Sequence, residues 1–361
     1  MRSVTGDAGK VLSSHRRRFR ETFLPASCVR FNNRSAPACH IRPLAERVVA
    51  IVAFLLIALP AIAWNDTGHE TVAEIAWQNL SQSRRDKIST LLLQHPHYRL
   101  LLATNVPSHV DTNEWVFLKA ATWPDMVRPT RGTNHAKPAF ITAYHHADWH
   151  YTNAPYIAPA DLGTVLPPGQ PEGKILEALS ANQAIVNDKT QPATNRAVAL
   201  CWLLHLIGDI HQPLHCVARF SAEFPDGDRG GNLEAIRPLT SAVVLHAWWD
   251  DLLGTGVSYK TIHDHATNLV QDPDLARSQL KELRHKKYSG WAAESIAAAR
   301  TNAYLEGQLN FVKIPGGDLN NVVDAAVPPL NPGYEINATT LARRRTSLAG
   351  RRLADVLKNL F

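Results

Sequence analysis

CWLLHLIGDIHQPLHC, residues 201–216, is an apolar run that contains several side chains able to bind a metal. It predicts a buried helix, on which His205 and Asp209, four residues apart, share one face. Pro213 interrupts the helical hydrogen bonds, so the chain bends and His215 can reach the same cavity. A single histidine on such a helix is most often a core residue, but three unpaired ligand-type side chains are costly to bury. The run therefore predicts a metal site.

The same spacing occurs again in LHAWWDD, residues 245–251, where His246 and Asp250 lie among apolar neighbours. Imidazole and carboxylate groups are ligands of zinc, and two such pairs can supply more than one ion. The chain has no Cys-x-x-Cys, so a structural zinc ribbon is not indicated. Cys201 and Cys216 lie about 20 Å apart if the chain between them is helical, too far for a disulfide. We expect both to be small buried residues.

The charge of the chain is concentrated near its beginning. The 361 residues are 45% hydrophobic, which is ample for a folded core, and the net charge is +6. Residues 1–63 hold ten basic and three acidic side chains, whereas residues 64–361 hold 28 and 29. The later part is therefore not a broad basic surface for nucleic acid. An anionic substrate would have to be held by metal charge and a few placed cations.

Residues 48–63, VVAIVAFLLIALPAIA, have the character of a signal peptide. The run is shorter than a transmembrane helix needs, and Ala61–Ala63 is the small-x-small pattern of a signal-peptidase site. The segment before it is too long for an ordinary signal, so we expect translation to start nearer Val48. We predict that residues 1–63 are a leader that is removed, and that residues 64–361 form a periplasmic or secreted domain without a membrane span. An uncleaved anchor is the alternative.

Helical periodicity recurs along residues 64–361, with no repeat or linker. We therefore expect an all-α protein, a single mainly helical domain. Asp66 or Thr67 can cap the first helix, Pro124 predicts a turn, and residues 135–155 predict an extended segment. Residues 224–232, FPDGDRGGN, predict a surface loop suited to lining a cleft. The expected helices cover residues 66–80, 83–94, 173–188, 194–211, 260–284, 289–307 and 339–359.

Six motifs, in a fixed order, make the chain resemble the zinc-dependent single-strand-specific nucleases of fungi and plants, which have bacterial relatives. They are Trp64 with Gly68-His69, WPDMVR, WHYTN, HLIGDIHQPLH, GGN and HAWWD. The resemblance runs from Trp64 to the last helix. It implies the helical fold shared by these nucleases and the zinc-dependent phospholipases C.

The resemblance also implies nine ligand residues for three zinc ions. The Trp64 ligands would be its α-amino group and carbonyl, so removal of the leader would be part of making the enzyme. The three sets are Asp125, His150, His205 and Asp209; Trp64, His69 and a shared Asp209; and His215, His246 and Asp250.

The other implied roles concern the substrate. Asp125, Arg128 and Asp209 would be catalytic, with Arg128 against the scissile phosphate. Tyr151, Asn153 and Asn232 match positions that line a nucleobase pocket, and fungal members carry an acidic residue where this chain has Asn153. His211 matches no ligand position, although it lies two residues after Asp209.

The implied reaction is hydrolysis of single-stranded DNA and RNA to 5′-nucleotides by a monomer, with 3′-nucleotides as further substrates. Paired zinc ions lower the pKa of water for attack on phosphorus. A phospholipase C of the related three-zinc type is one alternative, and Arg128, Tyr151 and GGN favour the nuclease over it. A periplasmic zinc-binding protein without catalysis is another, and it would bind metal without turnover.

Overall fold

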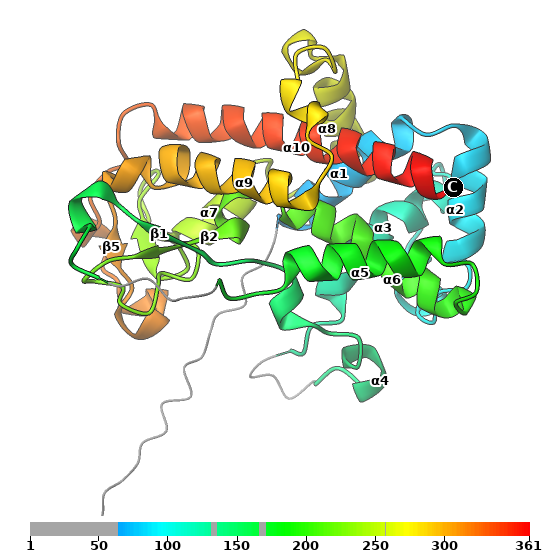
Figure 1. Cartoon of the computed structure of the whole chain (residues 1–361), viewed down its shortest axis with the longest axis horizontal. Helices are drawn as coiled ribbons and strands as arrows, with labels where there is room; N and C mark the ends of the chain where they lie inside the picture. Colours follow the sequence, from blue (N-terminus) through cyan, green and yellow to red (C-terminus); the bar gives the residue numbers. More distant parts are fainter. Residues whose placement is uncertain (1–63, 131–135, 166–170, 257) are drawn as a thin grey trace, which may run out of the picture. The chain divides into compact units, whose positions relative to one another are not determined.

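The computed structural model describes residues 64–130, 136–165, 171–256 and 258–361 (Figure 1). The predicted leader, residues 1–63, lies outside the described residues, so its removal stays a prediction. None of the helices in the described part combines the length and the apolar character needed to cross a bilayer.

The structure is mainly helical, which confirms the all-α class. Several 3-10 and π-helical turns join the α-helices. The α-helices are α1 (Asp66–Gln78), α2 (Gln82–Leu92), α3 (Thr112–Met126), α4 (Ala139–Thr142), α5 (Ile175–Asn187), α6 (Ala193–Asp209), α7 (Leu245–Asp250), α8 (Tyr259–Gln271), α9 (Tyr288–Ala298) and α10 (Tyr334–Leu360).

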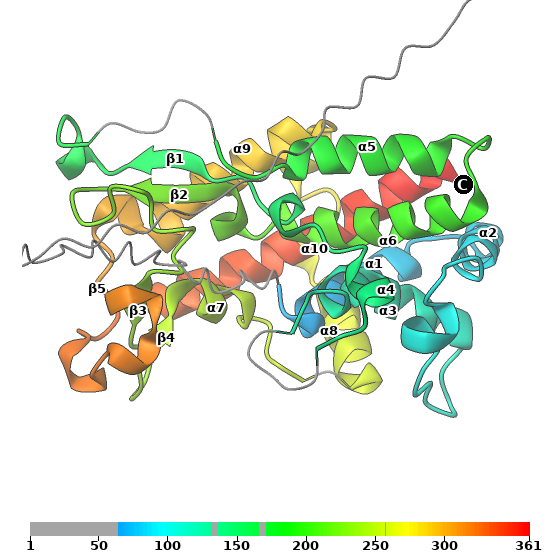
Figure 2. The same cartoon turned by 90° about the horizontal axis from the view of Figure 1, so that it is seen from below.

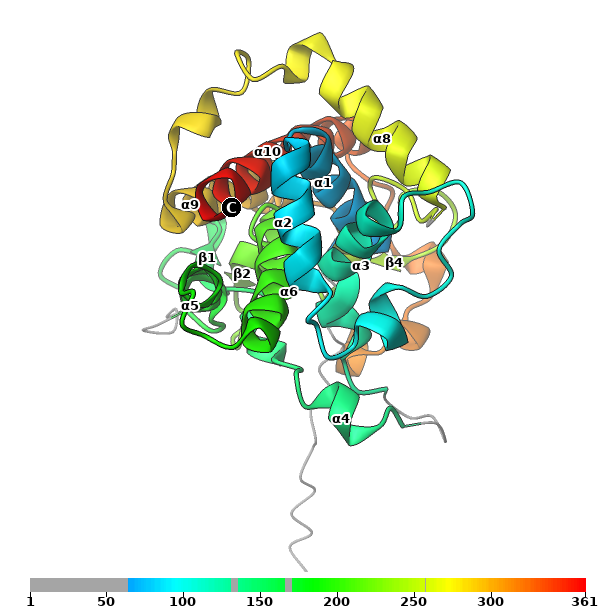
Figure 3. The ribbon, with the colours of Figure 1, turned by 90° about the vertical axis from the view of Figure 1, so that its right-hand side faces the viewer.

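Helix α6 is the central element of the core. Every side chain from Ala199 to Asp209 is buried, as expected for a helix that is apolar all round. α5 and α3 pack on either side of α6, and α10 lies above it beside α1 (Figure 3). Cys201 and Cys216 are buried free thiols, as predicted. The predicted metal-binding run therefore begins in the middle of the protein and not at its surface.

Short strands form two small sheets beside the helices (Figure 2). β1 and β2 pair in parallel, with Ala154 opposite Val217, and β3 lies between the antiparallel strands β4 and β5. The pairing of β1 with β2 matters for the site, because it places the chain just after Tyr151 beside the chain just after His215. The strands are β1 (Ala154–Ile157), β2 (Val217–Phe220), β3 (Glu234–Ile236), β4 (Val243–Val244) and β5 (Val312–Lys313).

Several predicted boundaries were wrong. Pro124 lies inside the last turn of α3 and does not make a turn. Proline has no N–H, so one helical hydrogen bond is missing there. Because Pro124 lies only two residues before the end of α3, the helix ends soon after this missing bond. Asn65, not Asp66 or Thr67, caps α1, through a bond from Gly68 N to its side chain. The segment 135–155 is extended only in part, since it contains α4 and a 3-10 turn, Ala147–Trp149.

Candidate metal centre

Asp209, at the end of α6, gathers three imidazoles around one buried carboxylate. Its Oδ1 lies 3.2 Å from His69 Nε2, and its Oδ2 lies 3.1 Å from His150 Nδ1 and 3.3 Å from His205 Nε2. The two carboxylate oxygens are thus divided between different histidines. All four side chains are buried. A carboxylate with this division can serve two cations at once.

Asp125, from the end of α3, adds a second carboxylate on the open side of this group. Its Oδ1 lies 3.7 Å from His205 Nε2 and 2.8 Å from Arg128 Nε. Burial raises the pKa of Asp125, but the positive charge of Arg128 and the neighbouring histidines outweigh it and lower that pKa to about 2. Asp125 is therefore ionised at neutral pH, next to a cation that is still partly exposed.

A second group lies on the other side of the Pro213 bend. His215 Nε2 and His246 Nε2 approach to 3.1 Å, and the Asp250 carboxylate lies 3.9 and 3.6 Å from them. The Nδ1 atom of each imidazole bonds to a backbone carbonyl at 2.7 Å, His150 O and Gly230 O respectively. Because a carbonyl only accepts, each Nδ1 must carry the proton.

This proton placement tests whether the group fits a metal. Burial lowers the pKa of His215 and so favours its neutral form, whose Nε2 lone pair faces His246 Nε2 and the Asp250 carboxylate. Asp250 Oδ2 is also buried without a hydrogen-bond partner among the described residues. His215, His246 and Asp250 bring one ligand atom each within 4.8 Å of one another, and two imidazoles with a carboxylate are a donor set of zinc. The residues present fit the ion.

His205 has the same arrangement as the second group. Its Nδ1 bonds to Ala121 O at 2.7 Å, so its Nε2 lone pair faces Asp209 and Asp125. Burial lowers the pKa of His150 to about 3, which keeps that imidazole neutral. Carbonyls that hold the second nitrogen of a ligand histidine are typical of zinc sites. The first group therefore also fits a metal.

Two glycines make room for the N-terminal part of the site. A Cβ on Gly208 would lie 2.6 Å from His69 Nδ1, and a Cβ on Gly68 would lie 2.7 Å from Trp64 Cβ. Trp64 is fully buried, and the next residue bonds to α7 through Asn65 N and Asp250 O. The structure thus brings Trp64 and His69 to the two groups. The role of the Trp64 α-amino group remains a prediction, because the chain before it lies outside the described residues.

The predicted substrate residues lie next to both groups, Tyr151 and Asn153 after His150 and Asn232 near His246. Tyr151 is half-buried, directly after His150, and Asn232 follows the two glycines that pack on His246. Asn153 is partly exposed and directs its amide to Glu172 Oε2 at 3.4 Å. Glu172 thus brings a carboxylate next to Asn153.

Comparison with known proteins identifies the family of the chain and two similar proteins. The S1/P1 Nuclease family model matches residues 64–361. The chain belongs to the S1/P1 nuclease family. Two curated relatives from Arabidopsis thaliana are similar to it. Endonuclease 3 is 22% identical over 330 residues, covering 87% of this chain and 94% of the relative. Endonuclease 4 is 25% identical over 321 residues, covering 83% and 90%.

The sequence did not reveal two positioning residues of this S1/P1 nuclease. Gln212 is fully buried, donates to Asp250 Oδ1 at 2.7 Å and accepts from Leu214 N, so it ties α7 to the bend. Asp228 is also fully buried, although FPDGDRGGN was predicted to be a surface loop. The position of Gln212 between two ligands was a usable signal. The only signal for Asp228 was its place beside two glycines.

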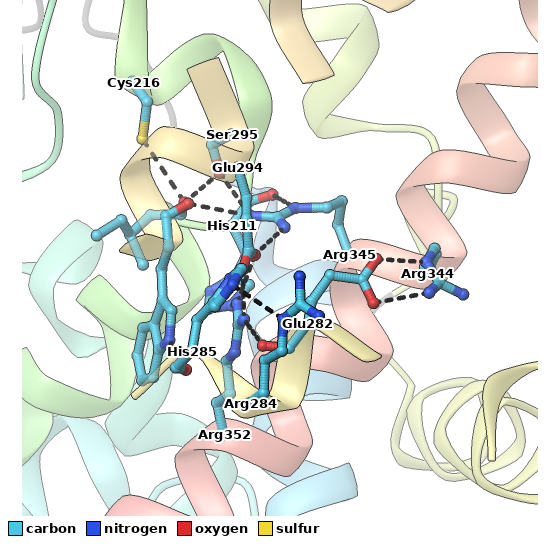
Figure 4. A network of polar contacts seen from close by, with 12 residues as sticks. His211, Cys216, Glu282, Arg284, His285, Glu294, Ser295, Arg344, Arg345 and Arg352 are labelled. Atoms are coloured by element: carbon cyan, nitrogen blue, oxygen red, sulfur yellow. Dashed lines mark hydrogen bonds and ion pairs between the residues drawn. The ribbon is translucent and has the colours of Figure 1, made fainter. Parts of the chain in front are cut away.

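His211 faces away from the metal groups, as its position on the helix predicts. Its Nδ1 bonds to Ile207 O at 2.7 Å, and its Nε2 accepts from Arg352 Nη1 at 2.8 Å. Figure 4 shows the buried network around it, in which Arg345 and Arg352 of α10 share the Glu294 carboxylate of α9. Arg345 Nε also donates to His211 O at 3.1 Å. α9 and α10 therefore hold the corner between Asp209 and His215.

We expect His211→Ala to keep its metal and its activity but to lose stability. The variant removes a buried hydrogen-bonded side chain, at a cost of about 1–3 kcal/mol in the free energy of unfolding. Metal analysis, steady-state rates and thermal unfolding measure the three quantities, with His205→Ala as the matched comparison that should lose metal. Loss of metal from a folded His211→Ala protein would show that this histidine is a ligand.

Proposed function

We propose that the protein hydrolyses phosphodiester bonds of single-stranded DNA and RNA to 5′-nucleotides, acts also on 3′-nucleotides, and uses three zinc ions as a monomer. The observation that supports this most directly is the pair formed by Asp125 and Arg128 at the open side of the Asp209 group. It combines a cation for the substrate phosphate with two groups of metal ligands, as the nuclease membership leads us to expect.

The residues that would hold the ions are the nine predicted ligands. Zinc bound there supplies Lewis-acid chemistry: it draws charge from phosphate oxygens and lowers the pKa of water. Arg128 donates to a non-bridging phosphate oxygen, and its Nε bond to Asp125 fixes the guanidinium in place. Tyr151 stacks on an unpaired base, and Asn232 offers amide hydrogen bonds to the base edge.

Single-strand preference follows from Tyr151 and not from a basic surface. A base inside a duplex cannot present its face to Tyr151, whereas stacking on an unpaired base contributes about 1–3 kcal/mol. The near-neutral charge of residues 64–361 gives little affinity for duplex backbone.

The test is digestion of one oligonucleotide, single-stranded or annealed, by protein that begins at Trp64. We expect single-strand cleavage that is lost on chelation and restored by zinc, with three zinc ions per chain. Release of phosphocholine from vesicles without DNA cleavage would instead support the phospholipase. Bound metal with neither reaction would support the alternative of a zinc-binding protein without catalysis.

We further propose that the protein is exported and that cleavage after Ala63 frees the Trp64 amino group. A variant that keeps one extra alanine before Trp64 should bind less zinc and lose activity. The loss of activity should exceed roughly 10–100-fold, which is the usual effect of removing a residue that only hydrogen-bonds to a metal ligand. N-terminal sequencing of the secreted protein identifies the cleavage site. Full activity of the extended protein would contradict the proposed ligand.

We expect Tyr151→Ala to raise KM on oligonucleotides and to leave zinc content unchanged, because the base contact exists both before and during reaction. Loss of about 1–3 kcal/mol of stacking corresponds to roughly a 5–150-fold rise in KM. Steady-state kinetics measures it, with Tyr98→Ala, on the turn after α2, as a control. Unchanged KM in a folded variant would exclude the stacking role.

A further inference from the structure

The loop that carries Asn232 has an unusual backbone. Arg229, Gly230 and Gly231 follow one another with φ of 58°, 65° and 81°. Glycine adopts this left-handed region freely, but a side chain such as that of Arg229 is strained there. Backbone strain of this kind is concentrated at functional sites in proteins.

Asp228 enforces this conformation. Its Oδ1 accepts from Arg219 N at 2.7 Å and Gly230 N at 3.0 Å, and its Oδ2 accepts from Gly231 N at 2.8 Å and Tyr304 Oη at 2.6 Å. Four donors on one buried carboxylate leave the loop little freedom. The direction in which Arg229 leaves the backbone is therefore fixed by buried contacts.

The loop and the Tyr151 segment pack on the same short turn. Gly230 lies against Leu214 O, where a Cβ would collide, and Thr152 N donates to His215 O at 2.8 Å. The Arg229 loop and the Tyr151 segment therefore meet at the turn that contains Leu214 and His215. The backbone carbonyl of Arg229 also accepts from Asn232 Nδ2 at 2.8 Å.

The guanidinium of Arg229 makes no hydrogen bond or ion pair with any residue in the described part of the chain. Arg229 is partly buried and lies on the same loop as Asn232, whose side chain would contact a base. A guanidinium in such a position is suited to a phosphate, which it can bind through two parallel hydrogen bonds.

We propose that Arg229 binds the 5′-phosphate of the nucleoside whose base stacks on Tyr151, and thereby favours strands and 5′-phosphorylated fragments over 3′-nucleotides. Arg128 is placed for the scissile phosphate, and Arg229 for the next phosphate in the 5′ direction. This inference rests on the proposed nuclease function and makes Arg229 a specificity-determining residue of the same site.

The test compares two substrates that differ only in this group, the dinucleotides pdApdA and dApdA, on the zinc-loaded protein. The wild type should have a kcat/KM about tenfold higher on pdApdA than on dApdA, because one hydrogen bond to a charged group contributes about this factor. Arg229→Gln should abolish this preference. Arg99→Gln, an exposed arginine beyond α2, is the matched control for the change in net charge and should keep it.

Arg229→Gly gives a second readout. Glycine at position 229 relieves the left-handed backbone strain, so the unfolding temperature of the variant should be unchanged or rise by about 2–4 °C. Its preference for pdApdA over dApdA should disappear. A folded Arg229→Gln or Arg229→Gly protein that keeps the preference overturns the assignment, as does a wild type that cleaves both dinucleotides equally well. If the zinc-loaded wild type cleaves neither of the dinucleotides and also fails to cleave longer single strands, the proposed nuclease function itself is wrong.

Discussion

Asp209→Asn is expected to lower the rate of phosphodiester hydrolysis by about 10³-fold or more, the largest loss of any single ligand change. The Asp209 carboxylate divides its two oxygens between His69 on one side and His150 with His205 on the other. An amide has one acceptor oxygen and no charge, so it cannot serve both sides. A bound metal contributes several kcal/mol to transition-state stabilisation, and each 1.36 kcal/mol is a factor of ten in rate.

Zinc content and rate should fall together in this variant. Asp86→Asn, on the exposed surface of α2, is the control for a charge change without loss of a ligand. Thermal unfolding of the metal-free proteins separates loss of metal from loss of fold. A folded Asp209→Asn protein that keeps its full zinc and its activity would refute the assignment of Asp209 to two ions.

Arg128→Ala is expected to lower kcat on a short single-stranded oligonucleotide by about 10²–10³-fold, with a smaller change in KM. In the proposed role the guanidinium would stabilise negative charge that grows on the phosphate oxygens during reaction, so its loss should affect the transition state more than binding. Lysine restores the charge but not the second donor, so Arg128→Lys should recover only part of the rate.

The alternative role for Arg128 is an ion pair with Asp125 alone. Its Nε lies 2.8 Å from Asp125 Oδ1, so loss of the pair would also affect the position of a ligand. Under that alternative, zinc content and stability would fall while kcat of the zinc-saturated protein would not. Unaltered kcat in a folded, zinc-saturated Arg128→Ala protein would refute the catalytic role.

Sequence reasoning could predict which side chains come together within each His-x-x-x-Asp pair, because these pairs depend on short spacing. His205 with Asp209, and His246 with Asp250, lie on single helices, where positions four apart share a face whatever the rest of the chain does. The all-α class was predictable for a similar reason, since the helical period repeats along most of the chain.

The missed features depend on contacts between distant segments. Pro124 reads as a turn, yet it lies in a helix. Gln212 and Asp228 look like ordinary polar residues, and only the fold shows that one holds Asp250 and the other holds the Arg229 loop. The burial of Arg345 and Arg352 against Glu294 likewise depends on contacts between helices that are distant in the sequence.

The hold of α10 on the Ile210–His211 corner has a consequence for the order of assembly. Residues 345 and 352 are synthesised more than a hundred residues after Asp209 and His215. Until α10 docks, nothing from that helix fixes the corner between the two ligand groups. A growing chain therefore contains all of the predicted ligands before it contains α10, and we expect hydrolytic competence to wait until that helix has docked.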